Sequence, residues 1–200
     1  DNHSGEFYQH STEQFLSYKD VVFTNCYSYD DKILVIDDAS DKVVDSITVL
    51  KQPSSMLMDK FNKIWVICDG GYEGSDYGND HAGLVRIDAE TRTVERAFIF
   101  ESDYWPSELH INGTGDTLYF INKDCWRMSV LDSSLPRNAF FKASESNLFY
   151  SLGVDPETSE VYLSDAIDHV QNGVVYRISP TGMARDTIPA GVIPGFIDFF

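Results

Sequence analysis

Short apolar runs recur along the chain with one shared pattern. Each has an aliphatic residue, an aromatic or aliphatic residue, another apolar residue, any residue, and then Asn, Asp or Cys. The four runs are VVFTN at 21, IWVIC at 64, LYFIN at 118 and VYLSD at 161, and their starts lie 43, 54 and 43 residues apart. Self-similarity at such a spacing indicates a repeat architecture.

Three further runs accompany each of these four. One follows directly, as KILVID, GLVRID, RMSVLD and VVYRIS, and another comes after it, as KVVDSITVL, TVERAFIF, RNAFFKA and ARDTIPA. A third precedes each unit, as EQFLSYK, PSSMLMD, PSELHIN and FYSLGVD. The runs are rich in β-branched and aromatic residues and are separated by turn residues, which is typical of strands. No segment keeps helical periodicity over a helix length, so the sequence predicts an all-β fold.

Units of four strands that recur every ~40 to 45 residues are typical of β-propeller blades. We therefore expect a β-propeller of four-stranded blades, with about four blades visible in a single domain over residues 1–200. The expected blades are 13–50, 53–101, 106–143 and 148–190, followed by a closing strand over 192–200. The extra residues of the 54-residue spacing lie in CDGGYEGSDYGNDHAG, at 68–83, which we interpret as an insertion between the second and third strands of the second blade.

The composition of the chain argues against several classes of function. The chain has 42% hydrophobic residues, enough for a core, and 32 Asp and Glu against 15 Lys and Arg, a formal charge of −17. Such a charge argues against nucleic acid as a partner and against an anionic membrane surface. No apolar run has the length of a transmembrane segment, and the three cysteines show neither a disulfide framework nor zinc spacing. The first residues lack a signal core and a start methionine, so we expect a mature or partial chain.

The repeats resemble a known family. A proline before the first strand, the xYxxN-like second strand and the VID-like third strand resemble YncE-like and surface-layer-protein-like seven-bladed propellers. GVVYRISPTG and IPAGVIPGFIDFF are similar to the end of outer-surface lipoproteins of that family in Bacteroides-type bacteria. The resemblance covers about residues 15–200 and implies the C-terminal part of a seven-bladed ring. A true four-bladed propeller and an open fragment remain alternatives.

The resemblance also implies which loops share a face. The loops between second and third strands would lie beside the connections between blades, and these segments hold most of the exposed rings, whereas the opposite loops are small and polar. Rigid aromatic residues with a polar tip are favoured at recognition surfaces. We therefore predict a ligand-binding face made by Tyr27, Tyr29, Tyr72, Tyr77, Asp80, His81, Tyr104, Trp126 and His169. The alternative is that several rings, Trp105 and Phe149 above all, pack between blades.

Two metal sites are alternatives to this interpretation. Glu108, His110 and Asn112 fall on one side of a strand by period-two alternation, and lactonase-type propellers, which GVVYRISPTG also resembles, hold a divalent cation on inner-strand Glu, Asn and Asp. Asp69, Glu73, Asp76 and Asp80 could form an irregular calcium site, although their spacing fails the EF-hand pattern. No GxSxG, P-loop or HExxH motif occurs.

The leading hypothesis is a non-enzymatic binding propeller with no catalytic residue and no cofactor. The resemblance implies a place at the cell surface or outside the cell, with a lipid anchor at the outer membrane. It also implies a ligand such as vitamin B12, a corrinoid, captured for an outer-membrane transporter. A metal-dependent hydrolase and a structural protein-protein interaction module are the alternatives.

Overall fold

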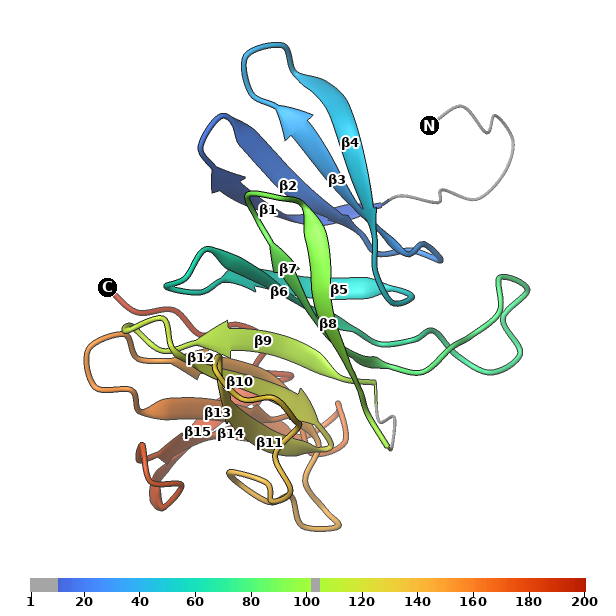
Figure 1. The fold of residues 1–200 in the computed structure, drawn as a ribbon. Helices are drawn as coiled ribbons and strands as arrows, with labels where there is room; N and C mark the ends of the chain where they lie inside the picture. Colours follow the sequence, from blue (N-terminus) through green and yellow to red (C-terminus); the bar gives the residue numbers. More distant parts are fainter. Residues whose placement is uncertain (1–10, 102–104) are drawn as a thin grey trace. The chain divides into compact units, whose positions relative to one another are not determined.

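A computed structural model describes residues 11–101 and 105–200, and within these ranges the chain forms strands and no helix. No helix that is long and apolar enough to cross a membrane occurs in the described part. The chain divides into two compact units, Asp1–Ser107 and Glu108–Phe200, which are described separately. Their strands are labelled in Figure 1.

The first unit contains two four-stranded antiparallel sheets, each with its strands in sequence order. One sheet consists of β1 (Thr12–Tyr18), β2 (Val21–Cys26), β3 (Lys32–Asp37) and β4 (Lys42–Thr48). The other consists of β5 (Pro53–Met58), β6 (Lys63–Cys68), β7 (Gly83–Asp88) and β8 (Thr93–Ile99). The two first strands, β1 and β5, contact each other.

The core of the first unit lies between these two sheets. Period-two alternation places every second side chain of a strand on the same face, so each sheet buries one row of apolar residues. The buried row consists of Phe23, Ile33, Val35, Ile47, Met56, Ile64, Val66, Val85 and Ile87. The apolar alternation seen in the sequence is therefore what joins the two sheets.

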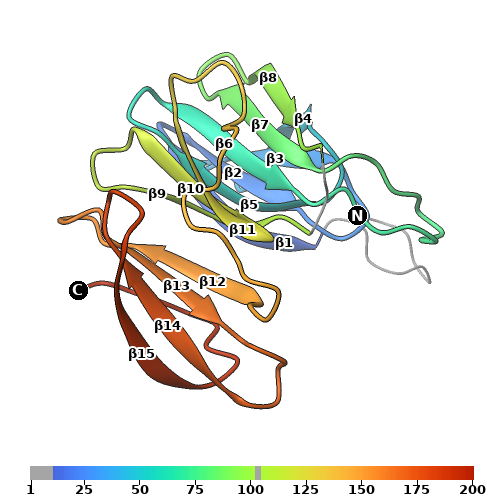
Figure 2. The ribbon, with the colours of Figure 1, turned by 90° about the horizontal axis from the view of Figure 1, so that it is seen from below.

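The second unit contains a three-stranded sheet and a four-stranded sheet. The first is β9 (Ser107–Ile111), β10 (Thr117–Asn122) and β11 (Asp124–Ser129), and the second is β12 (Phe149–Val154), β13 (Val161–Asp165), β14 (Asn172–Ile178) and β15 (Ala184–Val192). Figure 2 shows the strands of the second sheet side by side in sequence order. The core of this unit includes Tyr119, Ile121, Phe149, Leu152, Val161, Leu163 and Ile178.

The predicted all-β fold with blade-like antiparallel sheets is confirmed, but two expected strands are wrong. Residues 137–143 form only a single bridge, between Cys125 and Phe141. The backbone N–H groups of Phe140 and Phe141 both donate to the Cys125 carbonyl, at 2.9 and 3.0 Å, which interrupts the regular ladder of an antiparallel pair. The sheet of β9, β10 and β11, the third along the chain, consequently has three strands.

The expected closing strand over 192–200 is also not formed, because β15 ends at Val192 and the following residues adopt no strand. Pro194 has no N–H to donate to a sheet. The later residues instead contact the fourth sheet through side chains: the Phe199 ring lies 5.4 Å from the Tyr162 ring, and Ile197 packs over Gly153.

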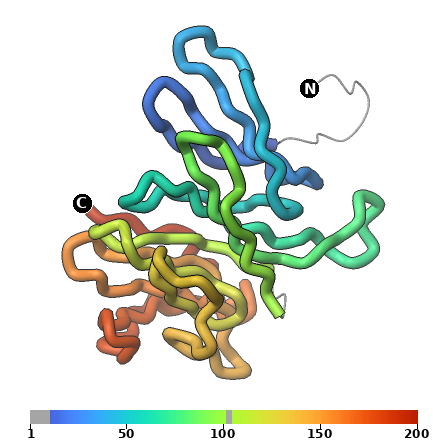
Figure 3. The backbone as a smooth tube through the Cα atoms, viewed as in Figure 1, coloured from blue at the N-terminus to red at the C-terminus, as the bar shows by residue number. Residues whose placement is uncertain are grey.

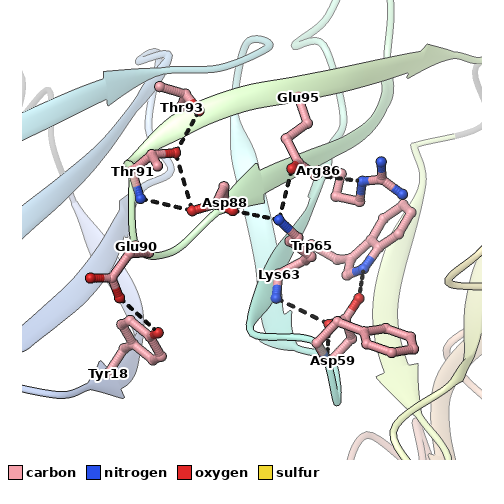
Figure 4. Close-up of polar contacts among 11 residues, drawn as sticks. Tyr18, Asp59, Lys63, Trp65, Arg86, Asp88, Glu90, Thr91, Thr93 and Glu95 are labelled. Carbon is pink, nitrogen blue, oxygen red and sulfur yellow. Dashed lines mark hydrogen bonds and ion pairs between the residues drawn. The ribbon is translucent and has the colours of Figure 1, made fainter.

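An Asp or Asn that accepts hydrogen bonds from its own turn recurs between the first and second strands of three sheets. Asp59 Oδ1 accepts from the N–H groups of Phe61 and Lys63 at 2.8 and 3.0 Å. Asn112 and Asp155 occupy the same place, and each accepts two N–H groups of its own turn through Oδ1. Such side chains replace the backbone partners that a turn lacks. Figure 4 shows Asp59 together with Trp65, whose indole N–H donates to the other carboxylate oxygen at 2.8 Å.

In two sheets, the Asn or Asp near the end of the second strand forms hydrogen bonds that hold neighbouring segments. In the first sheet, the buried Asn25 accepts from Gln14 N at 2.8 Å and donates to the Pro53 carbonyl at 2.7 Å. In the fourth sheet, Asp165 Oδ1 accepts from the N–H groups of Leu148 and Ile167, both at 2.9 Å. Cys68 takes this place in the second sheet, where it is a fully buried core residue.

Candidate functional site

A cavity of about 260 Å³ lies among the loops of the first unit. Its lining comes from four segments: the loop after β2, the connection before β5, the loop after β6 and the segment after β8. The lining residues are Tyr27, Ser28, Tyr29, Gln52, Asp69, Gly71, Tyr72 and Trp105. The cavity is therefore rich in aromatic rings, and no basic side chain is among these lining residues.

Asp69 is the acidic residue of this lining, and only 8% of it is exposed. Its Oδ2 accepts from the Tyr27 hydroxyl at 3.0 Å, and its Oδ1 accepts from Gly71 N at 2.8 Å. Burial raises the pKa of Asp69 above its ordinary value, although both hydrogen bonds act in the other direction. Burial and the neighbouring Asp69 charge raise the pKa of Tyr27 to about 12, so this phenol stays protonated and acts as a donor at neutral pH.

The long loop after β6 is held in place by its own turns and by its neighbours. Gly70 N donates to the Lys51 carbonyl at 3.0 Å, and Asp80 N donates to the Gly70 carbonyl at 2.9 Å, which closes the base of the loop. Turns from Tyr72 to Ser75 and from Ser75 to Gly78 shape its outer part. Figure 3 shows the loop extending beyond the end of its sheet. The insertion predicted from the sequence is thus an ordered loop.

A stacked pair of rings joins this loop to the first sheet. The Tyr29 and Tyr77 centroids are 4.3 Å apart and their planes differ by 26°. Lys51 Nζ also donates to the Tyr77 carbonyl. The loop after β2, the connection before β5 and the loop after β6 are therefore fastened together around the cavity.

Three non-glycine residues of the lining have a left-handed backbone. The φ angles are 61° at Tyr29, 54° at Gln52 and 51° at Trp105. This region is uncommon for residues with a Cβ and costs about 1 to 3 kcal/mol each. Such residues persist where the surrounding structure fixes them, and they often occur at ligand sites. Their coincidence at one cavity points to a functional site.

The structure brings together some of the predicted binding residues and separates others. Tyr27, Tyr29 and Tyr72 line the cavity, and Tyr77 stacks beside it. Asp80 and His81 are exposed on the same loop but do not line the cavity; the Asp80 carboxylate accepts from the backbone N–H of His81 at 2.7 Å. Tyr104 lies outside the described residues.

The remaining two predicted residues belong to the second unit. Trp126 is half-buried in β11, and its indole N–H donates to the Asn122 carbonyl at 3.1 Å. His169 is exposed in the loop after β13, and its ring meets Tyr150 edge to face at 5.6 Å. Neither residue takes part in the cavity of the first unit.

Sequence reasoning missed Gln52 and Asp69 as lining residues, and it gave packing between blades as the alternative interpretation for Trp105 and Phe149. Trp105 is 70% exposed and lines the cavity, whereas Phe149 is buried against Phe141 and Tyr176, as that interpretation predicted. The sequence suggests Asp69 only as a ligand of the irregular calcium site. A usable signal was its place directly after a buried strand, where side chains are fixed by the sheet rather than by a flexible loop.

The candidate hydrolase cluster brings Glu108 and His110 together, whereas the Asn112 side chain is engaged in its own turn. Glu108 Oε2 accepts from Ser151 Oγ and Leu152 N, both at 3.3 Å, and lies 3.6 Å from His110 Nε2. The Asn112 side chain is used by its own turn. Over residues 11–101 and 105–200, no group of three or more His, Cys, Asp or Glu side chains is arranged to hold a metal ion, and this includes the acidic residues of the long loop.

Known structures share the fold. No protein-family model matches the sequence, and no curated protein matches it significantly. Hydrazine synthase of Kuenenia stuttgartiensis aligns with a TM-score of 0.73 at 14% identity, over 95% of this chain and 52% of that one. A quinonprotein alcohol dehydrogenase-like protein from Bacteroides thetaiotaomicron aligns at 0.67 and 14%, over 88% of this chain and 45% of that one.

A third similar structure is the dihydro-heme d1 dehydrogenase NirN, in complex with DHE, with a TM-score of 0.64 at 9% identity over 90% of this chain and 38% of that one. The chain thus spans about half of the length of these proteins or less. At such identities the likeness shows the fold alone, which is of the β-propeller type. Function must be argued from the site.

Proposed function

We propose that this chain is a non-enzymatic binding module, and that the cavity of the first unit receives one group of a small ligand or of a partner protein. The observation that carries the proposal is the lining itself. Tyr27, Tyr29, Tyr72 and Trp105 come from three loops, and Trp105 is 70% and Tyr72 50% exposed. Exposed rings grouped around a cavity gain apolar contact when something docks on them.

Ligand-observed saturation-transfer NMR tests this proposal. Indole, choline and 3,3-dimethylbutan-1-ol serve as probes of the cavity. We expect at least one probe to bind the native chain and to lose its signal in a Tyr27→Leu/Tyr72→Leu variant. Phe61→Leu is the matched control, because Phe61 is 47% exposed in the turn before β6, at the opposite end of that strand from Asp69. Equal signals in all three proteins, or no signal with any probe, would contradict the proposal.

A narrower version of the proposal concerns the ligand. The resemblance to surface-layer-like propellers supports capture of a corrinoid for an outer-membrane transporter. The cavity of about 260 Å³ is below the ~300 to 1,000 Å³ of most small-molecule pockets, so a corrinoid would place a single amide arm inside it and cover the surrounding rings. Equilibrium dialysis with cyanocobalamin checks this version, with retention that falls in Tyr72→Leu and not in Phe61→Leu. Free passage of cyanocobalamin would rule it out.

The same resemblance supports a location at the cell surface. Protease treatment of intact cells that express the native protein, followed by immunoblotting, tests this location. We expect the protein to be degraded while a cytoplasmic marker survives. Protection of the protein until the cells are lysed would contradict a surface location, and it would leave the binding proposal unaffected.

A further inference from the structure

We propose that the cavity binds an organic cation, an alkylammonium or guanidinium group, between its aromatic rings and the Asp69 carboxylate. This inference rests on the proposed binding function and names the chemical class of the ligand. It follows from three properties of the lining: the rings, the buried acid and the absence of basic residues among the lining residues.

The rings provide the first part of the site. A cation above a Trp or Tyr face is attracted by the ring quadrupole, and the attraction is stronger when the pair is shielded from water. Tyr27, Tyr29, Tyr72 and Trp105 place four rings around one cavity. The stack with Tyr77 holds the Tyr29 ring in place. Cages of several aromatic residues are a recurrent way to hold quaternary ammonium groups.

The Asp69 carboxylate provides the second part. The Tyr27 hydroxyl and Gly71 N fix it by one hydrogen bond to each oxygen, which leaves further acceptor capacity on both. Burial raises the pKa of Asp69, because a carboxylate is less well solvated inside the protein than in water. The ionised form of Asp69 is therefore destabilised. A cation beside the carboxylate would offset this destabilisation. An anionic ligand would add to it.

Charge and size agree with this class of ligand. Lys51, which precedes Gln52 in the chain, directs its ammonium to the Tyr77 carbonyl and does not line the cavity. The formal charge of −17 raises the local concentration of cations around the protein. A volume of about 260 Å³ suits a single trimethylammonium or guanidinium head. The head could belong to a free small molecule or to a Lys or Arg side chain of a partner.

Matched pairs of probes test the inference. Choline and 3,3-dimethylbutan-1-ol have the same shape and differ in the charge of one atom, and a blocked Gly-Lys-Gly peptide is paired with its norleucine counterpart. Binding is followed by the amide shifts of Gly71 and the indole shift of Trp105 in two-dimensional NMR. We expect at least one cation to bind about tenfold or more tightly than its neutral partner. The tighter of the two cations identifies a free or a peptide-borne source.

Variants separate the contributions of charge and shape. Asp69→Asn preserves the shape, and its amide can accept from Gly71 N and donate to the Tyr27 oxygen, so the loop is expected to keep its fold. We expect this variant to lose the preference for the cation, whereas Glu73→Gln, a charge removal at an exposed site of the same loop, keeps it. If the neutral probes bind the native chain as tightly as the cations, the cation inference is wrong while the binding function stands. If no probe binds, both fail.

Discussion

The Tyr29 and Tyr77 rings stack with their centroids 4.3 Å apart, and this contact joins the first sheet to the long loop of the second. A double-mutant cycle with Tyr29→Ala and Tyr77→Ala measures how much this contact contributes to stability. We expect a coupling of about 0.5–1.5 kcal/mol in the free energy of unfolding, because stacked rings gain beyond the area that they bury. Urea denaturation of the four proteins provides the values.

The control for this cycle pairs Tyr29→Ala with Phe61→Ala, since Phe61 lies in a turn at the other end of its sheet. Those two changes should be additive. A coupling of zero between Tyr29 and Tyr77 would show that the loop is held by its backbone bonds and not by the stack.

A side chain at Gly70 should destabilise the protein more than a side chain at Gly74 in the same loop. Both have a positive φ, 81° and 87°, but a Cβ at Gly70 would lie 2.3 Å from the Asp80 carbonyl oxygen, whereas a Cβ at Gly74 meets nothing within 4 Å. Gly74→Ala should therefore cost only the left-handed backbone, about 1 kcal/mol, and Gly70→Ala more, about 2–4 kcal/mol or a displaced loop.

Thermal unfolding and hydrogen exchange of the Asp80 amide measure this pair. Faster exchange at Asp80 in Gly70→Ala alone is the expected signature, because that amide donates to the Gly70 carbonyl. Equal behaviour of the two variants would mean that the base of the loop is looser than its hydrogen bonds indicate.

Replacing Asn25 by alanine should destabilise the first unit by about 2–4 kcal/mol. Asn25 is fully buried, and its loss strands the Gln14 N–H and the Pro53 carbonyl without partners. Asn79→Ala, in the exposed part of the long loop, is the control and should change stability by less than about 0.5 kcal/mol. Urea denaturation compares the two, and a cost near zero for Asn25→Ala would show that water replaces its bonds.

Without the Lys63 ammonium, the free energy of unfolding should fall less as the pH is lowered. Lys63 contacts Asp88 and Glu95, as drawn in Figure 4, and its hydrogen bond, with that of Thr91 N, lowers the pKa of Asp88 to about 2. A lowered carboxyl pKa stabilises the fold above the ordinary pKa and loses that effect as the pH falls toward the lowered value. In Lys63→Met the pKa of Asp88 should rise, yet stay below its ordinary value, because Thr91 N still donates.

Carboxyl NMR titration of Asp88 and urea denaturation from neutral pH to about pH 2 follow this change. The native chain should lose more stability than Lys63→Met over the acid range. Lys32 lies in β3 of the first sheet, whereas Lys63 and Asp88 lie in the second. Lys32→Met should therefore leave the Asp88 titration unchanged. An unaltered Asp88 pKa in Lys63→Met would show that the turn, and not the ion pair, sets it.

Much of the fold could be read from the sequence because its causes are local. Alternating apolar residues mark the sheet faces, and the Asp or Asn of each turn satisfies neighbouring N–H groups. The missing strand at 137–143 has a non-local cause. Two successive N–H groups meet the Cys125 carbonyl, and no propensity of Phe140 or Phe141 indicates this.

The candidate site was predictable only in part for the same reason. Tyr27, Tyr29 and Tyr72 were predicted because the resemblance to known propellers implies that their loops share one face. In the sequence, Asp69 differs from the other acids of its loop only by its place directly after a buried strand. The hydrogen bond from Tyr27, which comes from another sheet, has no sequence signal. Trp126 and His169 satisfy the same sequence criterion, but their own contacts lie in the second unit.

The three cysteines have a practical consequence. Cys26, Cys68 and Cys125 are all buried with free thiols, and burial raises the pKa of each, that of Cys26 to about 11. Thiol-directed dyes react with exposed thiolates, so the native cysteines should stay silent in the folded protein. A cysteine introduced at Glu73 would then carry a single fluorophore beside the cavity, without any need for a cysteine-free background.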